Sequence, residues 1–296
     1  MKETSRTLII LHTAVFLAGW TGIFGRLIAL GGLPLVWYRM LVSGATLVLV
    51  LAFAGRLHKV PRPALLRIAA CGILLALHWV CFYLSIQASN VSIGVACIAT
   101  TCFFTALFDP IIGHKKFSWP EVLISFISIA GVLLIFSLDV RYRIGIAFGL
   151  LSAAIYSVFA ILNINVAERT GEDTATMLLW ELVGGVLFLT LCMPLYARMV
   201  PAEPMAPTRI ELVWLLLLGS LFTIVPFLFQ LEALRKLNAF TVNLTYNLEP
   251  VYSIAIAAVL FGEQREVGWS FWVGLILIIG SVLLQTRRLS RRQAPR

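Results

Sequence analysis

Polar side chains that could contact a ligand are set into an apolar stretch near the C-terminus, residues 241–263. On a helix, Asn243, Tyr246 and Asn247 share one face with Pro250, because they follow one another at intervals of three and four residues. Pro250 has no amide N–H, so it frees a backbone carbonyl one turn upstream. Among lipid tails, a polar and locally broken face is expected to line water or a ligand. We therefore take these two asparagines and the tyrosine as candidate ligand-binding residues.

Two charged residues, Arg39 and Glu249, also fall inside apolar stretches. A charge at the centre of a membrane helix costs about 2.5–3.5 kcal/mol on insertion scales, so each one needs a partner or water. One interpretation is structural: the two form an anchoring pair, or Arg39 snorkels to the surface. The other is direct recognition of a substrate carboxylate. If a proton moves together with a ligand, Glu249 is the candidate to carry it, because a carboxyl group shielded from water binds a proton more readily.

Three further candidates are aromatic or lie beside aromatic residues. Trp20 stands among Gly19, Gly22 and Gly25, a pattern that predicts close helix approach, and its ring either fills space or faces a cavity. His78 shares a helix face with Phe82. A buried neutral histidine bonded to a neighbouring helix is one reading of His78; the other is a hydrogen bond to a ligand or titration near neutral pH.

The remaining candidates belong to polar stripes on other apolar helices. Tyr156 and Asn163 lie on one face with Ser152, which favours the lining of a cavity. Gln230 follows Pro226 by four residues, and Pro226 is expected to loosen the backbone of this span. Gln230 could contact a ligand or bridge two helices. Thr101 could contact a ligand, or its hydroxyl could bond back onto its own helix.

Composition shows what kind of element must position these residues. Hydrophobic residues make up 60% of the chain and charged residues 12%, with a mean hydropathy of +0.95, whereas soluble domains typically carry about 25% charged residues. The chain therefore reads as an all-α polytopic membrane protein, with its first apolar run as a span and not a signal peptide. The ten spans expected are 7–30, 33–54, 64–86, 92–112, 119–138, 143–165, 175–197, 210–234, 241–261 and 268–286.

The distribution of the basic residues predicts the orientation of these spans. With the N-terminus in the cytoplasm, 16 of the 23 Lys and Arg residues fall in inside loops and tails and five in outside loops. This is the positive-inside bias, and it places both termini in the cytoplasm. The net charge of +9 is thus explained without a nucleic-acid partner. The basic tail, residues 287–296, is expected to anchor the topology near anionic lipid.

Motifs of enzymes and metal sites are missing from the sequence. The five cysteines all fall within expected spans and form no CxxC pair. There is no HExxH, no GxSxG and no GxxxxGK[ST] motif. We therefore expect no disulfide, no metal, no cofactor, no enzymatic activity and no ATP hydrolysis.

The chain repeats itself with an offset of 149 residues. Gly113 lies opposite Gly262 and Gly131 opposite Gly280, and this register places residues 100–101 opposite Glu249 and Pro250. We expect two halves of five spans each, residues 1–140 and residues 141–296, the second including the basic cytoplasmic tail. Because five is odd, the second half enters the membrane in the opposite orientation, as in many secondary transporters.

These motifs together resemble the drug/metabolite transporter superfamily in its EamA-type ten-span branch. The resemblance rests on the two halves, on Arg39 in WYRMLVSGA, on the turns SIQASNVSIGVA and ALRKLNAFTVNL, on LEPVYSIAIAAVLFGE and on the glycine-rich VGLILIIGSVLL. The aromatic residues within the spans make the chain most similar to bacterial aromatic amino acid exporters. The resemblance implies ten transmembrane helices arranged as two inverted five-helix repeats around a central cavity, and export by alternating access across the bacterial inner membrane.

The side chains of the expected cavity suggest what kind of small molecule it would hold. Aromatic walls with a few polar groups suit an amphipathic solute, such as an aromatic or other hydrophobic amino acid. Flat organic cations could stack on the same rings, so proton-coupled efflux of organic cations or drugs is the alternative. The halves differ where His114 stands opposite Glu263, so the site is expected to be asymmetric.

Overall fold

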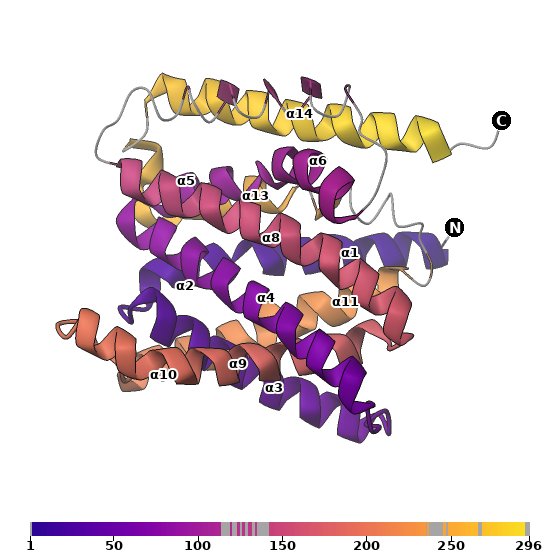
Figure 1. Ribbon diagram of the computed structural model, residues 1–296. Helices are drawn as coiled ribbons and strands as arrows, with labels where there is room; N and C mark the ends of the chain where they lie inside the picture. Colours follow the sequence, from indigo (N-terminus) through magenta and orange to yellow (C-terminus); the bar gives the residue numbers. More distant parts are fainter. Residues whose placement is uncertain are drawn as a thin grey trace.

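The computed structural model describes residues 2–113, 142–234, 248–265 and 268–293, together with 119, 123, 124, 126, 127, 130, 131, 134, 236, 245 and 246. Within these ranges all regular structure is helical (Figure 1). In chain order the elements are α1 (Lys2–Gly19), α2 (Thr21–Leu27), α3 (Gly32–Phe53), α4 (Arg62–Ala88), α5 (Val91–Ile98), α6 (Thr101–Ile112), α8 (Arg143–Thr170), α9 (Thr174–Met199), α10 (Arg209–Gly219), a π-helical turn (Ser220–Ile224), α11 (Val225–Leu234), α13 (Glu249–Phe261), a short 3₁₀ helix (Glu263–Arg265) and α14 (Trp269–Gln293).

In the part of the chain that the structure describes, seven helical segments are long and apolar enough to cross a membrane. Each matches one of the predicted spans to within a few residues at its start. They are Arg6–Leu27, Gly32–Phe53, Arg62–Ala88, Val91–Ile112, Arg143–Thr170, Thr174–Met199 and Arg209–Ala233. Two shorter apolar helices, Glu249–Phe261 and Trp269–Ser281, fall within the predicted spans 241–261 and 268–286. The predicted span 119–138 lies largely outside the described residues. The protein is thus an all-helical, multi-pass membrane protein.

The outward surface of the bundle is apolar, as lipid contact requires. Phe53 is 90% exposed, Leu191 81% and Val259 85%, which would be costly for a protein surrounded by water. The largest group of buried apolar side chains joins α2, α3, α4 and α9. The chain therefore packs a core between its helices while its outer face remains compatible with lipid tails.

Three of the spans are interrupted near their middle. The first is divided between α1 and α2 at Trp20, and the fourth between α5 and α6 at residues 99–100. At the second break the hydroxyls of Thr100 and Thr101 donate to the carbonyls of Cys97 and Ile98, each at 2.6 Å. The threonines do bond back onto their own helix, and the Cys97 carbonyl accepts from both the hydroxyl and the backbone amide of Thr100.

The third interruption is the π-helical turn between α10 and α11. Pro226 stands two residues after its last residue, Ile224. A proline cannot donate a backbone hydrogen bond, and it crowds the carbonyl one turn before it. The helix widens by one residue at this point, and the Thr223 hydroxyl donates to the Leu218 carbonyl at 2.7 Å. The prediction that Pro226 loosens this span is confirmed.

The first two spans of each half pack on helices of the other half. α1 packs on α11 and α13, while α8 packs on α4 and α5; α3 packs on α10, while α9 packs on α4. α3 and α9 also contact each other directly. Figure 1 shows the first turn of α1 and the last turn of α14 at the same end of the bundle, with α14 on the side opposite α3, α9 and α10.

Glycines bring α4 and α9 into backbone contact. A Cβ atom at Gly72 of α4 would collide with the backbone of Glu181 on α9, and one at Gly184 would collide with the backbone of Ala69. Two helices can approach so closely only where small residues face each other. This contact fixes the position of Glu181 relative to α4.

Candidate functional site

A cavity of about 590 Å³ lies in the middle of the bundle, with walls from both halves of the chain. Its lining comes from α1 to α6, α8, α9, the π-helical turn, α11 and α13, and from Tyr246. Nine of the twelve residues singled out in the sequence line it: Arg39, His78, Phe82, Thr101, Tyr156, Asn163, Gln230, Tyr246 and Glu249. The structure therefore brings together candidates that are up to 210 residues apart in the sequence.

Of the other three sequence candidates, only Trp20 belongs to the described residues. Trp20 is not among the lining residues, but its ring packs on Phe222, which is, with ring centroids 5.8 Å apart. Trp20 thus packs against a residue of the cavity wall, which agrees with the interpretation that its ring fills space. Asn243 and Asn247 lie outside the described residues.

One wall of the cavity is aromatic and is built by α4 and α8. The rings of His78 and Tyr156 lie 4.7 Å apart, those of His78 and Phe82 are stacked at 6.4 Å, and those of Tyr156 and Phe159 lie at 5.9 Å. These separations are typical of favourable aromatic pairs. The wall offers an apolar, polarisable surface to a bound molecule.

His78 is tied to the neighbouring helix α8. Its Nδ1 lies 3.0 Å from the Ser152 carbonyl and 2.9 Å from the Ser152 hydroxyl, and that hydroxyl donates to the His78 carbonyl at 2.8 Å. The side chain is 7% exposed. When Nδ1 donates to the carbonyl, a neutral imidazole keeps Nε2 as an acceptor. The geometry accordingly shows the helix-bridging role and leaves one ring nitrogen for a ligand.

Arg39 is held on several sides of its guanidinium group. Nη1 donates to the Tyr83 hydroxyl at 2.9 Å and Nε to the Thr223 hydroxyl at 3.2 Å, and Cζ lies 3.8 Å from the centroid of the Trp79 ring. No carboxylate oxygen of the described residues lies within 4 Å of it, although Glu249 is close enough to interact electrostatically. Arg39 is therefore anchored by neutral and aromatic partners and not by a direct ion pair.

Glu181 is a cavity residue that the sequence reasoning missed. It lies near the end of its span that the sequence predicts to be cytoplasmic, and this position predicts a side chain that reaches water. That prediction is wrong, because Glu181 is 2% exposed and lines the cavity. Asn163 Nδ2 donates to its Oε1 at 2.5 Å. The signal was available, because Glu181 follows Thr174 and Met177 at the spacing that keeps them on one helix face.

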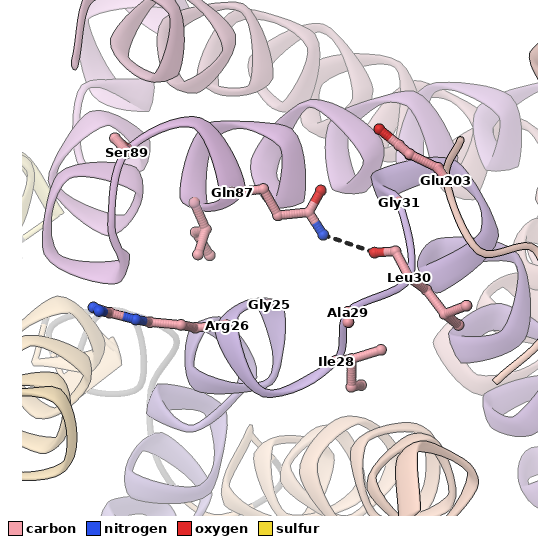
Figure 2. A pocket seen from close by; sticks show the side chains of 10 residues that line it. Gly25, Arg26, Ile28, Ala29, Leu30, Gly31, Gln87, Ser89 and Glu203 are labelled. Carbon is pink, nitrogen blue, oxygen red and sulfur yellow. Dashed lines mark hydrogen bonds between the residues drawn. The ribbon is translucent and has the colours of Figure 1, made fainter. Parts of the chain in front are cut away.

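A second, smaller pocket of about 420 Å³ lies where α2 and α4 end (Figure 2). Gln87 donates to the Leu30 carbonyl across it at 2.8 Å, while Arg26 extends from α2 away from that bond. Arg26 binds Glu263 at 2.8 Å. Its guanidinium thus has a carboxylate partner within the protein.

The carboxylate of Glu263 caps the N-terminus of α5. Its carboxylate accepts from the backbone amides of Val91 and Ser92 at 3.0 and 2.9 Å and from the Ser92 hydroxyl at 2.6 Å, in addition to Arg26. A carboxylate at a helix N-terminus satisfies open amide donors and complements the helix dipole. Glu263 therefore joins the end of α13 to α2 and α5.

At the other end of the bundle, two loops from different halves are joined by ionisable pairs. Arg56 contacts Asp173 at 3.1 Å and His58 contacts Glu172 at 2.7 Å. The hydrogen bond with Glu172 raises the pKa of His58. Burial by itself would raise the pKa of Asp173, but hydrogen bonds from Thr176 outweigh it and the pKa is lowered.

Comparison with known proteins shows one relative that covers most of the chain and another that covers about a quarter of it. A protein of Clostridium kluyveri described as an uncharacterized transporter is 23% identical over 226 residues, which is 73% of this chain and 70% of that protein. A permease-like protein of Bacillus subtilis is 36% identical over 67 residues, which is 23% of this chain and 83% of that protein. One crystal structure has the same fold, with a TM-score of 0.61 at 17% identity, covering 93% of this chain and 96% of that one.

The family assignment rests on a match that occurs twice. The sequence profile of the EamA-like transporter family matches residues 5–137 and again residues 143–287. These two matches span nearly the whole chain, and both halves contribute walls to the central cavity. The chain is therefore a multi-pass membrane transporter that belongs to the EamA-like transporter family.

Proposed function

We propose that the protein is a bacterial inner-membrane secondary transporter that exports aromatic and other hydrophobic amino acids, or related amphipathic metabolites, by alternating access. The observation that carries this proposal is the aromatic-walled cavity of about 590 Å³ in the centre of the bundle. Its volume lies within the range of small-molecule sites, about 300–1,000 Å³. Apolar walls supply affinity, and a few placed polar groups set orientation.

The polar groups of this site are spread over several helices. Asn163 comes from α8, Gln230 from α11, and Tyr246 precedes α13. Together with the His78 and Tyr156 rings they surround the cavity from both halves of the chain. A solute with an apolar body and one or two hydrogen-bonding groups fits this arrangement.

The proposed architecture has ten spans in two inverted five-helix repeats, residues 1–140 and 141–296. The exchange of packing partners between the halves supports it, because α1 and α8, and α3 and α9, occupy equivalent places. Alternating access would then move one group of helices against the other around the cavity. The breaks at Trp20, at residues 99–100 and at the π-helical turn are where helices could flex.

The proposed orientation places both termini in the cytoplasm. The surplus of Lys and Arg in the loops and tails on that side supports it. The first turn of α1 and the last turn of α14 lie at the same end of the bundle (Figure 1), in keeping with termini on one side of the membrane.

A second candidate is proton-coupled efflux of organic cations. The observation that favours it is that, among the described residues, the cavity lining holds two carboxylates, Glu181 and Glu249, and one guanidinium, that of Arg39. A cation or a proton could balance the surplus negative charge, and a flat cation could also stack on the aromatic wall.

Uptake into proteoliposomes separates these functions. The compounds offered are radiolabelled Phe, Trp, Leu and a flat dication. Uptake is measured with equal pH on both sides of the membrane and with a pH gradient across it. The proteins compared are the wild type, His78→Ala and Tyr246→Ala. Phe53→Ala, at a lipid-facing position that is 90% exposed, is the control. Saturable uptake of the aromatic amino acids without a pH gradient, lost in both cavity variants only, supports the proposal. Movement of the dication alone, and only with a proton gradient, supports the second candidate; if no compound moves, both are wrong.

A further inference from the structure

The charges that line the central cavity do not balance. Arg39 is the one Lys or Arg side chain in the lining among the described residues, whereas Glu181 and Glu249 are both carboxylates. With all three ionised, the cavity carries one negative charge in excess. Removing a charge from water costs several kcal/mol, so an unbalanced carboxylate here needs a proton or a cationic ligand.

The guanidinium of Arg39 makes no direct ion pair with Glu181. Its hydrogen bonds go to the hydroxyls of Tyr83 and Thr223, and among the described residues no carboxylate oxygen lies within 4 Å of it. The negative charge of Glu181 is therefore not offset by a contact with Arg39.

Glu181 has a partner for only one of its two oxygens. Asn163 Nδ2 donates to Oε1 at 2.5 Å, and in the part of the chain that the structure describes no hydrogen bond reaches Oε2 and no cation lies within 4 Å. The residue is 2% exposed and lines the cavity. This buried carboxylate presents its second oxygen to a bound molecule.

Two features hold this carboxylate in place. The glycine contact at Gly72 presses the backbone of Glu181 against α4, and Asn163 fixes the side chain from α8. The Tyr156 ring lines the same cavity as Glu181 and packs on the Phe159 ring. A cationic group bound at Glu181 would thus leave an attached apolar body next to the aromatic wall.

We propose that Glu181 binds the protonated amine of the transported molecule, with Asn163 as the positioning residue and the Tyr156 and Phe159 rings against the apolar body. The ligand class is a primary ammonium group carried on an aromatic or hydrophobic body. The inference rests on the proposed function and adds to it the residue that recognises the amine. Both an amino acid and a simple aromatic amine have this chemistry, so the test must separate them.

Equilibrium binding of three related ligands to the purified full-length protein in detergent provides the test. Phenylalanine has both an amine and a carboxylate, phenethylamine has only the amine, and 3-phenylpropanoate has only the carboxylate. Glu181→Gln keeps the shape of the side chain and an oxygen for Asn163. Glu232→Gln on α11 is the matched control, because Glu232 is half exposed, pairs with Lys236 at 3.2 Å and does not line the cavity.

The variant should discriminate between the ligands by their amine. Loss of a hydrogen bond to a charged group weakens binding by about tenfold or more. Glu181→Gln should therefore bind phenylalanine at least about tenfold more weakly than the wild type does, and the same holds for phenethylamine if the wild type binds it. Affinity for 3-phenylpropanoate should not fall. Asn163→Ala should give a smaller loss, also confined to ligands with an amine, and Glu232→Gln none.

Each other outcome has a definite meaning. Unchanged amine binding in Glu181→Gln, or an equal loss for all three ligands, overturns the role of Glu181 while the proposed function stands. If the wild type binds none of the three, the proposed function fails and this inference fails with it. If the wild type binds phenylalanine alone and Glu181→Gln no longer binds it, the role of Glu181 is supported and the site is one for amino acids. If the wild type also binds phenethylamine and Glu181→Gln binds neither, the role of Glu181 is supported and the site accepts amines in general.

Discussion

At the scale of single residues, Arg39 shows how a buried charge can be stabilised without a counter-ion in contact. Its guanidinium uses two hydroxyl acceptors and the face of Trp79. A planar guanidinium can make these contacts at once, and the ammonium group of a lysine cannot. The residue thereby connects α3 to α4 and to the π-helical turn.

We predict that Arg39→Lys lowers the thermal stability of the purified protein. The change keeps the charge but removes at least one charge-assisted hydrogen bond and the stacking contact, a loss of about 1.5–3 kcal/mol per bond. Thermal unfolding in detergent, followed by tryptophan fluorescence, measures it. Arg56→Lys is the control, because that pair with Asp173 is solvent-exposed and such pairs contribute little. Equal melting temperatures for the two variants would show that Arg39 makes no structural contribution.

His58 provides a prediction about pH. Its hydrogen bond with Glu172 raises the pKa of His58 in the folded protein above the unfolded value of 6.5. A raised folded-state pKa stabilises the protein fully below the unfolded pKa, and the stabilisation is lost as pH rises through the folded pKa. We therefore expect the wild type to melt above His58→Gln at acidic pH, with the difference shrinking above about pH 6.5.

The measurement is the melting temperature of the two proteins between about pH 5 and pH 9, a range that brackets the titration of histidine. His12→Gln, a change at an exposed position of α1, is the matched control. A difference between wild type and His58→Gln that stays constant over this range would contradict the role of the Glu172 contact.

At the scale of elements, the contact between α4 and α9 positions one wall of the cavity. We predict that Gly72→Ala destabilises the protein by about 1–3 kcal/mol, as overpacking does in a close-packed interior. The added methyl would meet the backbone of Glu181, which cannot rotate away. Thermal unfolding checks this, with Gly44→Ala on α3 as the control, since a Cβ there meets its nearest neighbour at an ordinary 3.8 Å. If Gly72→Ala unfolds at the same temperature as Gly44→Ala, the contact is looser than described.

Hydropathy predicted the long helices well and their interruptions only in part. Seven predicted spans match long apolar helices, because about 20 apolar residues in a row have few other structural options. Pro226 gave a readable signal for the π-helical turn. The break at Trp20 gave none, because it depends on α13 packing there: a Cβ at Gly19 would lie 3.0 Å from Tyr252 Cβ, and the Ser253 hydroxyl donates to the Gly19 carbonyl. Such tertiary contacts are not encoded in the local pattern.

At the scale of the whole molecule, the internal repeat predicted more than the individual motifs did. The register places residue 100 opposite Glu249, and the structure begins α6 at Thr101 and α13 at Glu249. The two helices thus begin within one residue of equivalent places. What the repeat could not give is the rotation of each helix about its axis. That rotation turns Glu181 into the cavity and keeps Trp20 out of its lining, and it is set by side-chain packing between helices that are distant in sequence.

The carboxylate of Glu263 has a consequence for how the bundle can open. Four donors from α2 and α5 converge on this one group. Any motion that separates the end of α13 from α2 and α5 must break these bonds, two at each oxygen of the carboxylate. In an alternating-access cycle of the kind proposed above, opening at this end would therefore have to release the whole carboxylate cluster.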